Sequence, residues 1–132
     1  MTLLIFDCDG VLVDSEMIAH AAMAELMSAL SRPMTTQEAL GIFAGRRLRD
    51  ALAAAEALLS APIPHDVGVA AGQRLLERFR RELKPVEGVR QAIEALPYAR
   101  CVASSSTPER LRVSLDVTGL APLFGDNVFS AD

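Results

Sequence analysis

The sequence lacks several features that mark whole classes of protein. Apart from a few adjacent arginines it has no cluster of lysine and arginine, and its 13 basic residues are outnumbered by 17 acidic ones. A nucleic-acid-binding face is therefore not expected. No apolar run approaches the roughly 18–20 residues that a membrane-spanning helix needs. The start of the chain contains no basic stretch and reaches an aspartate almost at once, so we do not expect it to be a signal peptide.

Cysteine is also scarce. The two cysteines, Cys8 and Cys101, lie within short apolar runs, where a thiol usually packs as a small hydrophobic group. A disulfide between them is the less favoured alternative. Free thiols are typical of a reducing compartment, so we expect a cytoplasmic protein.

The apolar residues that are present form a pattern of alternating strands and helices. The chain has 132 residues, of which 51% are hydrophobic, which suits one domain or a small domain with a large insertion. Short apolar runs at 3–6, 100–103 and 127–129 predict three strands. The first is apolar on both faces, as in a parallel sheet that helices cover on each side. Helical patterns at 88–96 and 107–118 separate the later strands, which indicates an α/β protein with a parallel sheet.

A long helical block lies between the first two predicted strands. It contains four predicted helices: Met17–Leu30, a short one that opens with a capping box at Thr35–Glu38, Leu48–Leu59 and Asp66–Leu83. The block is too long for an ordinary crossover between strands. We therefore expect an inserted all-α subdomain at 16–83 and a sheet domain made of 1–15 and 84–132.

The clearest chemical signal follows the first predicted strand. Asp7 and Asp9 lie at its carboxyl end, and Gly10 opens the turn. In open α/β sheets, ligands bind beyond the carboxyl ends of the strands. Two carboxylates this close repel each other, and a divalent cation that prefers oxygen ligands, such as Mg²⁺, would relieve the repulsion. From these three residues alone, a solvated acidic turn that caps the strand is an equally good interpretation.

The surrounding residues extend the signal. The string Phe6–Glu16, FDCDGVLVDSE, resembles the first motif of the haloacid dehalogenase superfamily of phosphohydrolases position by position. Cys101–Ser106, CVASSS, is similar to the second motif of that family, a strand that ends in a phosphate-binding serine or threonine. The resemblance covers the whole chain. It implies a Rossmann-like parallel sheet with an inserted helical cap, similar to the branch of phosphoglycolate phosphatases and beta-phosphoglucomutases.

The resemblance also implies a role for each matched residue. Asp7 would be the nucleophile that attacks phosphorus and becomes an aspartyl-phosphate. Asp9 would protonate the leaving alcohol and then activate water, and the Asp7 carboxylate and the Asp9 backbone carbonyl would bind Mg²⁺. Gly10, Ser104 and Ser105 would hold the phosphoryl group. The implied function is a Mg²⁺-dependent phosphatase of a small phosphorylated metabolite, such as a sugar phosphate, with no nucleic-acid or membrane partner.

Alternatives within the family differ in particular residues. Dehalogenases generally lack an aspartate at the position of Asp9, so dehalogenation is not expected. Sugar-phosphate mutases carry a histidine in the first cap helix, but here Ala19 stands at that position and His20 follows it, turned by about 100°. A phosphomutase is the nearest alternative, although no role is carried over to His20, for which a partly buried cap position is the plainer interpretation. Arg46, at a turn of the cap, would bind a second anionic group of the substrate or else be an ordinary solvent-facing charge.

Two further motifs of the family have no counterpart in these residues. They are a lysine that neutralises the aspartate and the phosphate, and an acidic pair that completes the Mg²⁺ site. Lys84 is the only lysine, and it precedes the second motif. The missing groups are expected beyond Asp132, so the core would be incomplete and residues 1–132 alone would be a poor phosphatase. The alternative from another class is a non-catalytic fragment or binding module.

Overall fold

The computed structural model describes all residues from 1 to 132. They form two compact units, the first made of Met1–Ser15 and Phe79–Asp132, and the second made of Glu16–Arg78. The sequence analysis placed the second boundary at residue 84, whereas the structure divides the chain near the end of a helix, between residues 78 and 79. None of the helices has the length and apolar character that crossing a membrane requires.

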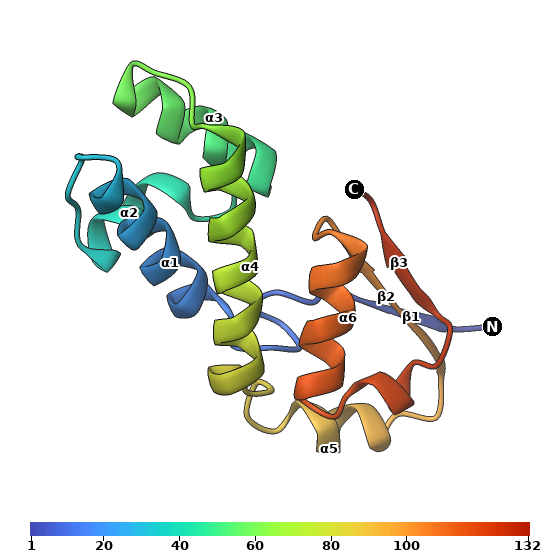
Figure 1. Ribbon diagram of the computed structural model, residues 1–132. Helices are drawn as coiled ribbons and strands as arrows, with labels where there is room; N and C mark the ends of the chain where they lie inside the picture. The colour runs from blue at the N-terminus through green and yellow to red at the C-terminus, as the bar shows by residue number, and fades with distance from the viewer. The chain divides into compact units, whose positions relative to one another are not determined.

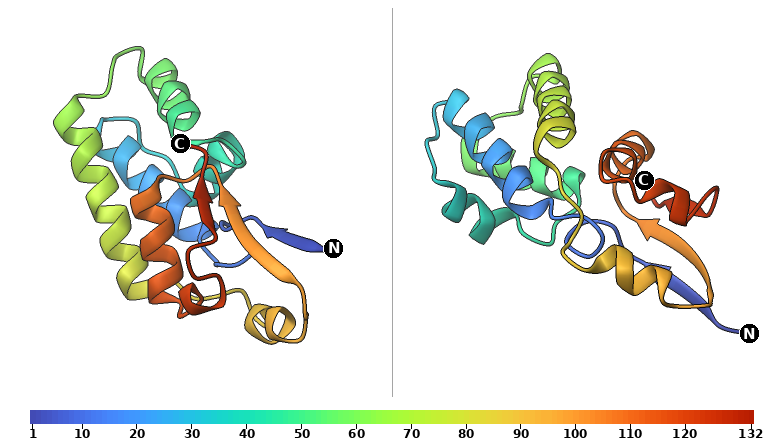
Figure 2. Two further views of the ribbon diagram at one scale, coloured as in Figure 1. Left: turned by 90° about the vertical axis from the view of Figure 1, so that its right-hand side faces the viewer. Right: turned by 90° about the horizontal axis from the view of Figure 1, so that it is seen from below.

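The first unit is built on a three-stranded parallel sheet. β1 (Leu3–Phe6), β2 (Ala99–Ser104) and β3 (Val128–Ser130) are paired in that order, and Figure 2 shows them side by side in its left view. The α/β class with a parallel, Rossmann-like sheet is therefore confirmed. The third strand begins one residue later than the sequence pattern predicted.

The helices of this unit lie on one face of the sheet. They are α5 (Val89–Glu94), α6 (Pro108–Val117) and the short 3-10 helix η1 (Ala121–Leu123). Because the strands succeed one another in one direction and crossovers are right-handed, both connections fall on the same side. On that side the rings of Phe6 and Phe124 meet edge to face at 5.8 Å, and Nη1 of Arg100 donates to the Ile93 carbonyl of α5 at 2.8 Å. Figure 1 shows α6 alongside β2 and β3.

The opposite face of the sheet is open to solvent in residues 1–132. The register places Leu3, Ile5 and Phe129 on this face, and their exposed fractions are 54%, 65% and 57%. The expectation that helices cover the first strand on both sides is therefore wrong for these residues. The physical reason is that both crossovers have the same hand and run the same way, so they supply only one layer of helices. β1 also forms one edge of the sheet.

The second unit is all-α. Its helices are α1 (Glu16–Ala29), α2 (Thr36–Phe43), α3 (Leu48–Leu59) and most of α4 (His65–Glu82). Thr35 and Glu38 form the predicted capping box at the start of α2, with reciprocal hydrogen bonds of 3.1 and 2.7 Å. Small side chains let α1, α2 and α3 approach closely, and the buried core of the unit consists of Ala24, Met27, Ala39, Phe43, Ala51 and Ala55.

Within the first unit, the segment that leads out to the insertion runs beside the segment that returns from it. The Asp14 amide donates to the Lys84 carbonyl at 2.9 Å, and the Val86 amide donates to the Leu12 carbonyl at 2.9 Å. These two hydrogen bonds hold the loop after β1 against the segment that follows the insertion.

Candidate functional site

The loop that follows β1 is a tight turn held by its own backbone. The amides of Val11, Leu12 and Val13 all donate to the carbonyl of Cys8, at 2.9 to 3.2 Å. Gly10 has φ of +76°, a left-handed conformation that glycine adopts at little cost. The position of the two aspartates on this turn is therefore fixed by local structure.

The two aspartates have different surroundings. Asp7 is exposed, and its Oδ1 accepts a hydrogen bond from the next backbone amide at 2.7 Å. Asp9 is partly buried and accepts from three side chains. Ser15 Oγ donates to Oδ1 at 2.8 Å, Ser106 Oγ to Oδ2 at 2.5 Å and Arg110 Nη2 to Oδ1 at 3.1 Å. Both oxygens of Asp9 are engaged, while the Asp7 carboxylate faces solvent.

Arg110 reaches Asp9 from the first turn of α6. Thr107 caps this helix, and its hydroxyl accepts from the Arg110 amide at 3.2 Å. A cation in the first turn is opposed by the positive end of the helix dipole, so a nearby anion is needed to offset it. The guanidinium carbon lies 5.1 Å from the centroid of the Phe79 ring, and Nε is buried without a hydrogen-bond partner. The side chain is thus held between an aromatic ring and the Asp9 carboxylate.

These contacts determine the charge on Asp9. Burial alone would raise the pKa of Asp9, but the positive charge of Arg110 and the hydrogen bonds from Ser106 and Ser15 outweigh it and hold the pKa below its ordinary value. Asp9 is therefore a carboxylate at neutral pH. Arg110 therefore supplies part of the positive charge that the two neighbouring aspartates require.

The thiol between the two aspartates is buried. Burial raises the pKa of Cys8 to about 12, and the negative charges of Asp9 and Asp7 add to the effect. Cys8 and Cys101 are both buried free cysteines. Cys8 is thus a packed, protonated side chain, as its position on an apolar run indicated.

The serines after β2 lie at the same edge of the sheet as the turn after β1. β1 and β2 are parallel neighbours with Phe6 opposite Val102, so their carboxyl ends meet. Ser104 is only 5% exposed, and its hydroxyl accepts from the Ser106 amide at 3.1 Å, which closes the turn. Ser105 is exposed. The predicted residues of the two motifs are therefore brought together.

Arg46, a predicted substrate-binding residue, and His20, the residue next to the position of the mutase histidine, belong to the second unit. Arg46 follows α2, is exposed, and donates through Nε to the Ile42 carbonyl at 2.9 Å. His20 is buried in α1, with Nδ1 2.6 Å from the Glu16 carbonyl. A carbonyl oxygen only accepts, so this contact places a proton on Nδ1. His20 is a packed helix residue, in line with the plainer interpretation of the sequence.

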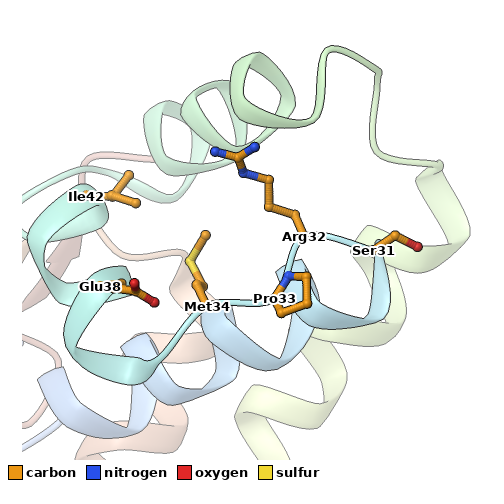
Figure 3. A pocket seen from close by; sticks show the side chains of 6 residues that line it. All are labelled: Ser31, Arg32, Pro33, Met34, Glu38 and Ile42. Atoms are coloured by element: carbon orange, nitrogen blue, oxygen red, sulfur yellow. The ribbon is translucent and has the colours of Figure 1, made fainter.

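The second unit also contains an open pocket of about 340 Å³. Figure 3 shows its lining, which comes from the turn after α1 and from α2: Ser31, Arg32, Pro33, Met34, Glu38 and Ile42. Its one carboxylate, that of Glu38, already accepts from the Thr35 amide. None of the predicted site residues lines this pocket.

The donor atoms at the strand ends fit a hard divalent cation by type but make only part of a coordination shell. The Asp7 carboxylate and the Asp9 backbone carbonyl are oxygen donors of the kind that Mg²⁺ accepts. Three side-chain donors already occupy the Asp9 carboxylate, two on Oδ1 and one on Oδ2. Nowhere in the chain do three or more His, Cys, Asp or Glu side chains gather where they could hold a metal ion.

Sequence reasoning missed two of the residues around Asp9. Ser106 was read only as part of a serine run, and Arg110 as part of a helix. The sequence did contain an indication for Arg110. A positive charge in the first turn of a helix is unfavourable next to the positive end of the helix dipole, so a nearby anion is expected. Ser15, the last residue of the first unit before the insertion, donates to Asp9 as well.

Comparisons with known proteins agree with this geometry. A family model described as haloacid dehalogenase-like hydrolase matches residues 1–132. The 6-phosphogluconate phosphatase of Escherichia coli (strain K12) is 26% identical over 95% of this chain and 57% of its own length. A crystal structure of a conserved haloacid dehalogenase-like protein of unknown function from Agrobacterium tumefaciens superposes with a TM-score of 0.81 at 36% identity, covering 98% of this chain and 58% of that one.

A family hydrolase from Deinococcus radiodurans, solved with bound phosphate and sodium, gives a TM-score of 0.71 at 25% identity, covering 98% of this chain and 57% of that one. The chain thus spans somewhat more than half the length of the relatives it matches.

Proposed function

The chain belongs to the haloacid dehalogenase-like hydrolase family, and on this premise we propose that it carries the nucleophile, the acid–base residue and a phosphate-binding loop of a Mg²⁺-dependent phosphatase. The substrate class is a small phosphorylated metabolite such as a sugar phosphate. The observation that carries the proposal is the exposed Asp7 carboxylate at the end of β1, next to an Asp9 carboxylate that three donors hold in place. The E. coli relative, a 6-phosphogluconate phosphatase, supports the substrate class.

In the first half of the reaction, Asp7 acts as the nucleophile. One of its carboxylate oxygens forms a bond to phosphorus as the bond from phosphorus to the substrate oxygen breaks, which gives an aspartyl-phosphate. Oδ1 accepts from the Cys8 amide, which leaves Oδ2 for the attack. Asp9 is a carboxylate in the free chain, so for this step it takes up a proton from solvent when the negatively charged phosphate binds beside it. It then gives this proton to the leaving alkoxide, and a neutral alcohol departs.

In the second half, Asp9 acts as a base. Its carboxylate takes a proton from a water molecule whose oxygen attacks phosphorus, the bond from phosphorus to Asp7 breaks, and inorganic phosphate leaves. The surroundings of Asp9 favour the ionised form, which is the form that this half requires. After phosphate leaves, Asp9 loses this proton to solvent and returns to the carboxylate form of the free chain.

The remaining roles concern charge and orientation. Ser104, the Ser105 amide and Gly10 would hold the transferring phosphoryl group. The Asp7 carboxylate and the Asp9 backbone carbonyl would hold Mg²⁺, which when bound would offset the negative charge of the phosphate. Arg46 would bind a second anionic group of the substrate, as a guanidinium does well.

Hydrolysis of phosphate esters tests the proposal. We expect slow release of inorganic phosphate from p-nitrophenyl phosphate and from sugar phosphates in the presence of Mg²⁺, and its loss when EDTA is added. Asp7→Asn should abolish release, because an amide of the same shape is a far poorer nucleophile. Hydrolysis that persists in Asp7→Asn at more than a few per cent would exclude Asp7 as the nucleophile. A requirement for a bisphosphorylated activator would favour a phosphomutase instead.

A further inference from the structure

The environment of Arg110 is unusual for a residue whose only task is to stabilise a helix. It occupies the first turn of α6, where its charge opposes the helix dipole. Its Nε is buried and lacks a hydrogen-bond partner, and the guanidinium carbon lies 5.1 Å from the centroid of the Phe79 ring. A cation at the start of a helix and a buried nitrogen without a partner are both unfavourable, and such exceptions occur mainly at functional sites.

Its one strong polar partner is Asp9. The Nη2–Oδ1 distance is 3.1 Å, and the side chains are 18% and 28% exposed, so solvent screens the pair only in part. The Ser15 and Ser106 hydroxyls complete the shell, one on each oxygen of the carboxylate. Rotation of the Asp9 carboxylate would break the bonds to all three donors at once.

We propose that Arg110 is a positioning residue that fixes the orientation of the Asp9 carboxylate and does not itself bind substrate. The Phe79 ring packs against the guanidinium and the Asp9 carboxylate binds one of its terminal nitrogens, which together hold the side chain in place. The proposal rests on the acid–base role of Asp9 in the proposed function. Arg110 therefore affects proton transfer only by orienting Asp9.

Leaving-group chemistry separates this role from a general effect on the fold. An alkyl phosphate needs a proton on its leaving oxygen, whereas p-nitrophenolate leaves readily without one. We expect Arg110→Met to lower kcat for a sugar phosphate by about tenfold or more, with KM changed less than twofold. The effect on p-nitrophenyl phosphate should be several times smaller. Arg110→Lys should recover part of the loss because it retains the charge.

Two further variants complete the kinetic test. Arg112→Met, on the exposed side of the same helix, is the matched control and should match the unchanged protein with both substrates. In the Asp9→Asn background, Arg110→Met should cause no additional loss. A rise in KM as the main effect would show that Arg110 touches substrate. An equal loss with both leaving groups would show a structural role, and either result would overturn the proposal.

A measurement that does not depend on turnover separates failure of this proposal from failure of the proposed function. Chemical unfolding of the unchanged protein, Arg110→Met, Asp9→Asn and the double variant forms a thermodynamic cycle. We expect the unfolding equilibrium constants to deviate from additivity by about twofold or more. Additive effects would refute the link between Arg110 and Asp9 even in an inactive protein. Coupling without any hydrolysis would uphold the link and reject the phosphatase activity.

Discussion

The Ser106 hydroxyl lies 2.5 Å from Oδ2 of Asp9 and joins the loop after β2 to the loop after β1. The end of β3 is attached to the same residue, because the Ser130 hydroxyl donates to the Ser106 carbonyl at 2.6 Å. Hydrogen bonds to a carboxylate are stronger than those between neutral groups. The three strand ends are therefore coupled through Ser106, and a change at one is expected to alter the geometry of the others.

Asp7→Asn should abolish hydrolysis and leave the fold intact. The amide oxygen of asparagine can still accept from the Cys8 amide, so the turn is preserved. Removing one of two neighbouring negative charges should leave the unfolding temperature unchanged or slightly raised without Mg²⁺. Phosphate release and thermal unfolding are measured on the same preparation.

The matched control for this variant is Asp14→Asn, an exposed aspartate of the same loop region. It should retain most of the activity. If both variants lost activity equally, the effect would belong to the charge of the loop and not to the nucleophile.

Ser104→Ala should slow the chemical step more than it weakens the fold. A hydroxyl directed at a phosphoryl oxygen typically contributes about 10²-fold in rate. The same change leaves the Ser106 amide without its acceptor, which should lower the free energy of unfolding by about 1 kcal/mol. Kinetics and urea unfolding are compared with Ser28→Ala, an exposed serine of α1. A large loss of stability with normal catalysis would make Ser104 a purely structural cap.

Stability should fall in acid because of Asp9. Burial raises the pKa of this carboxyl, but Arg110, Ser106 and Ser15 lower it to a net value below the ordinary 3.8. Its contribution to stability is therefore fully present above the ordinary pKa and is lost as the pH falls through the lower, folded-state pKa. As the pH falls below about 4, the unfolding temperature should drop less steeply in Asp9→Asn than in the unchanged protein.

Asp116→Asn provides the comparison for this acid dependence, because Asp116 is exposed on α6. This variant should follow the unchanged protein across the whole pH range. If the unfolding temperature depended on pH in the same way in all three proteins, the loss of stability in acid would not come from Asp9.

The 132-residue chain on its own should associate and turn over slowly. β1 is an edge strand, and its Leu3 and Ile5 side chains are more than half exposed. An apolar edge of this kind favours pairing with another chain. Activity should be low because no three His, Cys, Asp or Glu side chains of these residues gather to hold a metal ion, which leaves the site for Mg²⁺ incomplete. Light scattering and steady-state kinetics on residues 1–132 measure both effects.

Ile5→Lys should reduce the association, since a charge on an edge strand opposes pairing. Val69→Lys places the same charge on an exposed apolar position of α4 and should leave association unchanged. A monodisperse unchanged chain with ordinary phosphatase rates would contradict both parts of the prediction.

The sequence by itself determined the features that depend on neighbouring residues. The capping box at Thr35 follows from two side chains three positions apart, whose hydrogen bonds form within one turn of chain. The helical pattern at Leu48–Leu59 likewise predicted the observed bounds of α3. The parallel sheet also followed from sequence, because apolar runs that alternate with helices have few other arrangements. The motif at Asp7 and Asp9 identified the family by resemblance, and the family model confirmed it.

Only the tertiary structure decided which groups surround Asp9 and which face of the sheet is open. Arg110 and Asp9 are 101 positions apart, and their contact exists because β1 and β2 pair in a particular register and α6 starts beside that edge. The exposure of Leu3 and Ile5 follows from the hand of two crossovers, which no local pattern encodes. Local hydrogen bonds are set by spacing along the chain, whereas these contacts depend on how distant segments pack.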